Sequence, residues 1–466
     1  MGCGKTSSIL NYIEQADSHV KFLYVTPYLT EVERIQKECP SKHFVAPSAQ
    51  NKKGTKMFNF RQMIKKGENI VITHELFKNL SIEEFEGLNG LQEYFLVMDE
   101  VANVIEPLQI NKSDVDNILK NYATVDKEGK LIWTYKDKVI WNDVYINTSN
   151  TPKKNFKRYN LAKLCEYELL YVYGGKVFVW IFPVEIFKMF AKSILITYMF
   201  DGQIQGAYYK MHNVGIKYLH IQSDLEAEKK KHSNKNYWIE DNIYDRPQEF
   251  DMSIYKSLIN ICDNKKLNAI GDSYFFNKKL KNTNLSKSWY NSNSRDNPKL
   301  ITQLKNNTYN YFFNITKTKT EDNMWTTFEA YKDQLKGKGY TSGFVPCNAR
   351  ATNDYRNKKS LAYLCNRYIH PIITNFLEAH KVEVDQDKFA LSEMIQWIFR
   401  SQIRQYKPIN IYIPSERMRE LLIDWLNCRI QSGTFDDIKI NSENIEEYYK
   451  ENNDINNAVN IDDLDT

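Results

Sequence analysis

The chain contains few cysteines, and they form no recognisable pattern. Seven of its 466 residues are cysteine, none lies in a C-x-x-C pair, and none lies beside paired histidines. Zinc sites and redox motifs require such spacings, and disulfide frameworks are typical of oxidising compartments. The sequence therefore argues against a zinc site and predicts a protein of a reducing compartment.

Targeting segments and long apolar runs are also lacking. No signal peptide is recognisable at the start of the sequence. A membrane-spanning helix needs about 20 consecutive apolar residues, and the longest candidate, 169–187, is interrupted by Gly174, Gly175, Lys176 and Pro183. We therefore predict a cytoplasmic protein with no membrane partner.

The composition is that of a folded chain with a basic surplus. Hydrophobic residues make up 42% and aromatic residues 14% of a chain whose length suits two or three domains. The formal charge is +5, but residues 435–466 alone carry −8, which leaves +13 on the rest. Such an excess favours a polyanionic partner such as nucleic acid.

Short apolar runs alternate with amphipathic stretches, a pattern typical of an α/β protein with mostly parallel sheets. In the first half this pattern predicts strands at 22–25, 69–72, 94–98 and 193–196, and helices at 7–15 and 30–38. An insertion at about 105–190 separates the third and fourth of these strands. It contains two predicted hairpins, 131–141 and 169–182, and the second turns at a Gly-Gly pair that can adopt positive φ.

The second half has the same character and ends in an acidic tail. Its strand candidates are 216–221, 267–270, 344–347, 360–365 and 409–414. The polar stretch 285–314 is expected near the surface, and the acidic tail is expected to be flexible because it lacks core-forming residues. We predict domains at 1–205 and 206–433, followed by the tail at 434–466.

The first residues match the second half of the phosphate-binding pattern G-x-x-x-x-G-K-[ST]. In this pattern backbone N–H groups and the lysine hold phosphates while the Ser/Thr hydroxyl reaches Mg²⁺. Gly2, Gly4, Lys5 and Thr6 are the matching residues, and the helix expected after them adds its dipole to phosphate binding. We expect Met1 to be internal to a longer protein, with the opening glycine and its strand upstream.

Two acids follow the third predicted strand directly. Asp99 and Glu100 would project from the carboxyl edge of a parallel sheet, where ligands of open α/β sheets bind. Asp99 suits Mg²⁺ binding together with Thr6, and Glu100 suits polarisation of an attacking water. The alternative is a strand that leaves the sheet at a charged turn.

A basic helix is predicted at 390–404. Gln396, Arg400 and Arg404 are spaced four residues apart and would share one helix face. Two guanidinium groups and an amide on one face suit stabilisation of charge on a transferring γ-phosphoryl group. A solvated basic face or a contact with a nucleic-acid backbone would explain the same pattern.

These elements, in this order, resemble the superfamily 2 helicases of the DEAD/DEAH type. The amino-acid sequence around 325–328, 348–355 and 412–419 is similar to that of helicase-like proteins encoded by bacteriophages. The resemblance implies two RecA-like P-loop NTPase domains that bind ATP and Mg²⁺ between them, in the cytoplasm of a host bacterium. It further implies a nucleic-acid partner, DNA rather than RNA, and a role beside replication proteins in replication or recombination.

The resemblance also assigns roles to individual positions. Arg400 is similar to the arginine finger, with Gln396 and Arg404 beside it. Residues implied in nucleic-acid contact or coupling are Thr26, Pro27, Thr73, Thr197, Asn348, Arg350, Thr352 and Asn353.

Two alternative functions remain open on the sequence. One is a helicase-like clamp that binds nucleic acid without hydrolysis. The other is a different P-loop enzyme, such as a small-molecule kinase or a packaging ATPase. A kinase needs no distant arginine helix, and a packaging motor would carry a nuclease-like acidic cluster in a folded C-terminal part.

Overall fold

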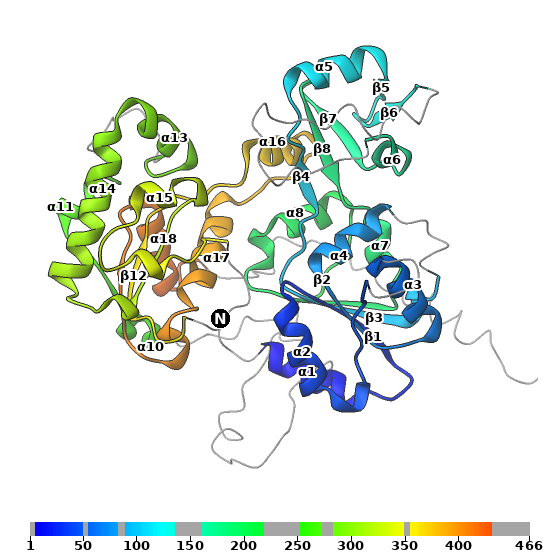
Figure 1. The fold of residues 1–466 in the computed structure, drawn as a ribbon, viewed down its shortest axis with the longest axis horizontal. Helices are drawn as coiled ribbons and strands as arrows, with labels where there is room; N and C mark the ends of the chain where they lie inside the picture. Colours follow the sequence, from blue (N-terminus) through cyan, green and yellow to red (C-terminus); the bar gives the residue numbers. More distant parts are fainter. Residues whose placement is uncertain are drawn as a thin grey trace, which may run out of the picture.

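Two parallel four-stranded sheets form the framework of the molecule. Figure 1 shows the computed structural model. The two sheets confirm the predicted α/β class with mostly parallel sheets. The structure describes residues 5–49, 55–82, 89–135, 161–218, 252–272, 283–348 and 355–430. Within these residues no helix is both long and apolar enough to cross a bilayer.

The first sheet contains all four strands predicted in the first half. Its order is β2-β1-β3-β9 and every pairing is parallel. The strands are β1 (Lys21–Thr26), β2 (Ile70–Thr73), β3 (Tyr94–Asp99) and β9 (Lys192–Ile196). β1 and β3 lie inside the sheet and are almost wholly buried, which is why they read as continuous apolar runs.

Helices cover this sheet and complete what we term the first unit. They are α1 (Lys5–Gln15), α2 (Leu29–Glu38), α3 (Lys56–Lys66), α4 (His74–Lys78) and α8 (Ile204–Met211). α1 buries Ile9, Leu10 and Ile13 in a cluster with Phe22 and Tyr24 of β1. Both helices predicted here, at 7–15 and 30–38, are confirmed.

The insertion adds a small antiparallel sheet of order β4-β8-β7. Its elements are β4 (Ile105–Pro107), α5 (Lys112–Asn121), β5 (Ala123–Val125), β6 (Leu131–Trp133), α6 (Leu161–Glu166), β7 (Leu170–Tyr173), β8 (Val177–Ile181) and α7 (Val184–Lys188). The Gly-Gly hairpin is confirmed, with φ of 56° at Gly174 and 64° at Gly175. Of the hairpin predicted at 131–141, the structure describes β6, which pairs antiparallel with the preceding strand β5; the predicted turn and second strand lie outside the described residues.

The second sheet has the order β10-β13-β12-β11, again parallel throughout. Its strands are β10 (Ile259–Ile261), β11 (Asn323–Thr326), β12 (Ser360–Tyr363) and β13 (Ile409–Tyr412). The predictions at 360–365 and 409–414 are confirmed, whereas β10 and β11 were not predicted.

Three other strand predictions in this half fail. Residues 267–270 overlap α11 (Lys265–Asn268), because the Asn264 side chain accepts from the Leu267 N–H and starts a helix there. Residues 344–347 make a single bridge, from Phe344 to Trp325. The described part of 216–221 forms no strand, and the rest lies outside the described residues.

Helices flank the second sheet and form with it the second unit. They are α10 (Ser253–Leu258), α11, α13 (Lys287–Asp296), α14 (Pro298–Asn310), α15 (Lys332–Leu335), α17 (Gln386–Ile398) and α18 (Glu416–Leu426). The stretch expected near the surface, 285–314, instead supplies Tyr290, Ile301 and Leu304 to a buried cluster. Most other residues of this stretch are exposed or half-buried, as predicted, although Thr308 is fully buried.

One helix leaves the second unit. α16 (Pro371–Ala379) follows β12 in the chain, yet its side chains join the large buried cluster around β3, β7 and β8. We term this cluster, which includes Leu96, Tyr171 at its margin and Phe182, the first core. Figure 1 shows α16 beside β4 and β8, apart from the other helices of its half. The boundary predicted at residue 205/206 falls inside α8, and the predicted tail lies outside the described residues.

Candidate functional site

The two acids lie at the carboxyl edge of the first sheet. Asp99 ends β3 with 8% of its surface exposed, and the His74 Nε2 atom lies 2.9 Å from its carbonyl oxygen. Glu100 has a φ of 68°, which is uncommon for a residue with a side chain. Its N–H donates to the carbonyl oxygen of Ile196 at 2.9 Å. The chain therefore turns sharply at Glu100 while it is still held by β9.

The surroundings of Asp99 raise the pKa of its carboxyl, because burial and neighbouring acids outweigh the nearby cations. Burial and, to a smaller extent, the charges of Glu100 and Glu31 raise the pKa of its carboxyl to about 7, against the opposing effects of Arg34 and Lys5. Burial and neighbouring like charge both disfavour the ionised carboxylate. A cation placed at this edge would stabilise the ionised form.

Thr197 joins the acid pair from the neighbouring strand. It follows β9 directly, and its Oγ1 donates to Glu100 Oε2 at 3.0 Å. Because β9 pairs with β3 up to Asp99 and Ile196, the two strands deliver Thr197 and Glu100 to the same edge. The hydrogen bond fixes the direction of the Glu100 carboxylate.

Lys5 and Thr6 lie at the start of α1. The Lys5 Nζ atom is 5.4 Å from the centre of the Tyr198 ring, a cation–π distance, and its charge stabilises ionised Asp99. The structure therefore places the lysine near the acids. The predicted glycines Gly2 and Gly4 lie outside the described residues.

The second unit contributes an arginine to this electrostatic environment. Partial removal of water from the Arg404 guanidinium lowers its pKa, as do the charges of Arg356 and Arg34, while Glu31 and Asp99 oppose the shift. Arg404 is thus within electrostatic range of Asp99. Arg400 is instead 7% exposed.

The helix predicted over 390–404 is shorter than expected. α17 ends at Ile398, and a short 3₁₀ helix, Gln402–Gln405, carries Arg404. The break has a local cause: the Ser401 side chain accepts from the Ile403 N–H and starts the new turn. Gln396, Arg400 and Arg404 therefore do not share one helix face, and Gln396 is 9% exposed within α17.

A comparison with known proteins places the chain in a family. It is 35% identical over 432 residues to the SPbeta prophage-derived protein YonV of Bacillus subtilis (strain 168), with 91% of this chain and 97% of the relative covered. The chain belongs to the YonV family. Residues 253–426 also match the model of the YonV C-terminal Rossmann-like domain, which corresponds to most of the second unit.

Among solved structures, S. tokodaii Xpd4 is similar at 11% identity over 91% of each chain. The TM-score is 0.36, and a score of this size supports no conclusion about function.

The remaining predicted residues of this YonV-family chain are placed as follows. Thr26 is fully buried at the end of β1, directly before Pro27. Thr73 caps α4, since its Oγ1 accepts from the Leu76 N–H at 3.3 Å. Asn348 lies exposed in a turn, whereas Arg350, Thr352 and Asn353 lie outside the described residues.

Sequence reasoning missed the segment after Thr197. Trp425 Nε1 of α18 donates to Tyr198 Oη at 2.7 Å, and Gln205 Oε1 accepts from the Ala102 N–H at 2.7 Å. The segment therefore contacts both the acid turn and the second unit. The sequence offered one signal for this segment, namely that it directly follows Thr197. Its contact partners Ala102 and Trp425 lie too far away in the sequence to be predicted from residue spacing.

The described residues contain no group of three or more acidic, histidine or cysteine side chains able to hold a metal. Such a group would be needed for a metal cage built from protein alone. Mg²⁺ bound with a nucleotide commonly uses only one or two carboxylates and takes its other ligands from phosphates and water. Buried Asp99 beside Glu100 fits that second kind of site, and Thr6 lies in the first turn of α1.

Proposed function

We propose that this protein is an ATP-dependent nucleic-acid helicase or translocase of bacteriophage origin, acting on DNA in replication or recombination. The observation that carries the proposal is the position of Asp99, Glu100 and Thr197 together at the carboxyl edge of the first sheet, with Lys5 at the start of α1 over the ring of the adjacent Tyr198. The charge of Lys5 in the first unit lowers the pKa of Asp99, and the charge of Asp99 in turn raises the pKa of Arg404 in the second unit. The prophage origin of YonV supports the viral assignment.

The proposed roles follow from the chemistry of each side chain. Lys5 and the N-terminus of α1 bind phosphate, and Asp99 with Thr6 holds Mg²⁺. Bound Mg²⁺ would supply neutralisation of the phosphate charge. Glu100, directed by Thr197, accepts a proton from the attacking water.

Arginine from the second unit completes the proposed site. A guanidinium directed at a transferring phosphoryl group stabilises the charge that develops there. Arg404 is the better candidate for this role, because it lies within electrostatic range of Asp99, whose charge raises its pKa. Arg400 is buried, and with Gln396 it is proposed to support the turn that carries Arg404.

Contact with DNA is proposed to come from the loops at the carboxyl edges of the sheets. The basic surplus outside the acidic tail suits attraction to a phosphate backbone. If the protein neutralises Z phosphates of a single strand, log K falls with log salt at a slope of about −0.7Z. We expect a steep slope in a filter-binding or anisotropy titration, and a flat one would count against strand tracking.

ATP hydrolysis by the full chain, with and without single-stranded DNA, tests the proposal. We expect DNA to stimulate turnover, and Glu100→Gln to lower it by roughly 10²–10⁴-fold because the proton acceptor is lost. Lys5→Ala should weaken nucleotide binding as well as turnover. Lys299→Ala, on the exposed face of α14, is the matched control and should change neither.

The same experiment separates the alternatives. Tight DNA binding with no hydrolysis by the wild-type protein would indicate a nucleic-acid clamp. Hydrolysis that ignores DNA would indicate another P-loop enzyme. Absence of both nucleotide and DNA binding would refute the proposal altogether.

A further inference from the structure

The chain between β12 and α17 crosses from the second unit to the first and returns. We term residues 366–385 the arm. At its tip α16 buries Ile373, Phe376 and Leu377 in the first core. The rings of Phe376 and Tyr171 meet edge to face, with centroids 5.5 Å apart. The tip of the arm is therefore part of the hydrophobic interior of the first unit.

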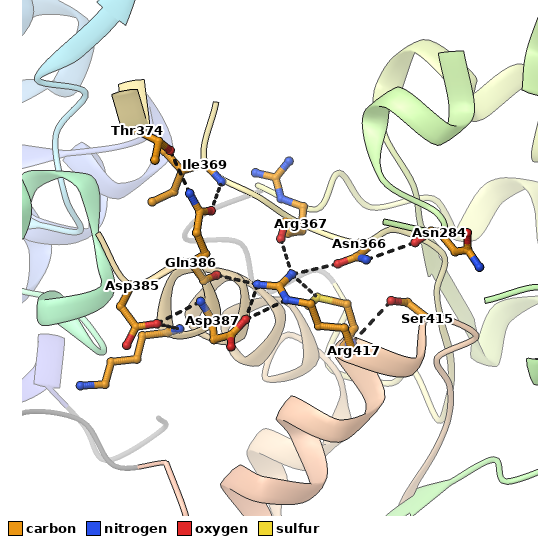
Figure 2. Close-up of polar contacts among 12 residues, drawn as sticks. Asn284, Asn366, Arg367, Ile369, Thr374, Asp385, Gln386, Asp387, Ser415 and Arg417 are labelled. Carbon is orange, nitrogen blue, oxygen red and sulfur yellow. Dashed lines mark hydrogen bonds and ion pairs between the residues drawn. The ribbon is translucent and has the colours of Figure 1, made fainter. Parts of the chain in front are cut away.

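A single arginine of the second unit closes the base of the arm, as Figure 2 shows. Arg417 lies at the start of α18, and its Nη1 atom donates to Asn366 Oδ1 at 2.9 Å and to the Arg367 carbonyl at 2.8 Å. Its Nη2 atom donates to the Gln386 carbonyl at 2.8 Å, and Nε donates to Asp387 Oδ1 at 2.7 Å. One guanidinium thus binds both the segment that leads out to α16 (366–367) and the segment that returns from it (386–387).

Further polar contacts link the base to the root of α16. Gln386 Oε1 accepts from the Ile369 N–H at 2.8 Å, and Gln386 Nε2 donates to Thr374 Oγ1 at 2.8 Å. Arg417 also lies over the Tyr368 ring, 4.2 Å from its centre. Its side chain is 11% exposed, so the planar fork is held among packed partners, a geometry that lysine cannot reproduce.

Apolar burial holds the tip of the arm in place, whereas hydrogen bonds hold its base. Moving α16 out of the first core would expose large apolar side chains to water, with no compensating contact. Opening the base would exchange hydrogen bonds among protein groups for hydrogen bonds to water, which is a smaller net loss. Other polar contacts join the units near the base: Gln203 Nε2 donates to Ser392 Oγ at 2.5 Å, and Lys388 Nζ donates to Asp201 Oδ2 at 2.8 Å. Relative movement of the units is therefore expected to exchange polar contacts at the base and beside it, and to leave α16 docked.

We propose that the arm is the permanent attachment of the second unit to the first, and that Arg417 is the clamp of a hinge at its base. The two units then change their relative position by exchange of Arg417 contacts while α16 stays docked. This inference does not depend on nucleotide hydrolysis, and it holds or fails separately from the proposed function.

Hydrogen exchange of the full-length protein, resolved by mass spectrometry, tests this assignment. Arg417→Ala should speed exchange of the amides at 366–370 and 385–388 by tenfold or more and leave α16 protected. Phe376→Ala should do the reverse, with faster exchange in α16, β7 and β8. Arg429→Ala, near the C-terminal end of α18 with a 70% exposed side chain, is the matched control and should change neither region.

Small-angle scattering of the same proteins reports the arrangement of the units. Arg417→Ala should enlarge the maximum dimension or broaden the distance distribution, whereas Arg429→Ala should not. Arg417→Lys retains the charge without the fork and should give intermediate exchange at the base, which serves as the test if the alanine variant does not fold. Equal loss of protection in α16 and at the base, or an unchanged base in both Arg417 variants, would overturn the hinge.

Discussion

At the scale of single residues, the hydrogen bond between Thr197 and Glu100 links the acid turn to the neighbouring strand. A hydrogen bond to a charged group contributes about 1.5–3 kcal/mol. We predict that Thr197→Val, which keeps the side-chain shape, lowers ATP turnover by roughly 10–100-fold with little change in KM. Steady-state kinetics check this prediction.

Thr302→Val is the matched control for that measurement. Thr302 is exposed on α14, and its hydroxyl donates to the carbonyl of Pro298 at 3.1 Å. Its replacement should leave turnover unchanged. Wild-type turnover in the Thr197 variant would mean that Glu100 does not need this orientation.

Sequence patterns predicted the sheet edge at which Asp99, Glu100 and Thr197 lie, but not the arrangement of the arginines. Asp99, Glu100 and Thr197 follow buried parallel strands, and strand ends fix positions at a sheet edge. The predicted positions of Arg400 and Arg404 depended on an unbroken helix, whereas α17 ends at Ile398 and Ser401 caps the start of a separate 3₁₀ turn. A cap of this kind looks the same in sequence as an ordinary serine within a helix.

At the scale of elements, the Gly174-Gly175 hairpin allows the effect of a positive φ on the free energy of unfolding to be measured separately from steric contacts. Gly175 has a φ of 64°, and an added Cβ would meet nothing within 4 Å. We predict that Gly175→Ala lowers the free energy of unfolding by roughly 1–2 kcal/mol, because a left-handed conformation is costly for a residue with a Cβ. Urea denaturation measures the change.

Gly215→Ala provides the control for this cost. An added Cβ at Gly215 also meets open space, but its φ lies outside the left-handed region. That substitution should be neutral or stabilise by up to about 1 kcal/mol, through the unfolded state. Equal losses in both variants would show that positive φ is not the cause.

Elements with a continuous apolar run were predictable, and those with mixed composition were not. β1 and β3 carry such runs, whereas β11 begins with buried Asn323 and ends with buried Thr326. Asn323 is satisfied by the Gly339 carbonyl, to which its Nδ2 atom donates at 2.8 Å. A polar side chain paired so far along the chain leaves no local signal of burial.

At the scale of the whole molecule, docking of α16 joins the stability of the two units. We predict a single calorimetric unfolding transition for the full-length protein, because the first core includes side chains of α16, which belongs to the second half of the chain. Phe376→Ala should lower the free energy of unfolding by about 3–5 kcal/mol and separate the transition into two.

Phe312→Ala is the corresponding control in the second unit. Phe312 is 3% exposed in the cluster with Tyr290 and Leu304, away from the arm. Its loss should lower the unfolding temperature and leave one transition. One transition in the Phe376 variant would show that α16 does not couple the units.

The arm also determines when the protein can finish folding. Translation completes every strand of the first sheet long before it reaches α16, so the nascent first unit exposes the apolar seat that Phe376 later fills. Exposed apolar surface of this kind makes folding intermediates prone to aggregate. A fragment cut at the limits of the family match, 253–426, would carry the opposite fault, an apolar α16 with nowhere to dock. We expect either fragment, the first unit or 253–426, to need a chaperone when it is produced alone. When the two fragments are co-expressed, they should associate through α16.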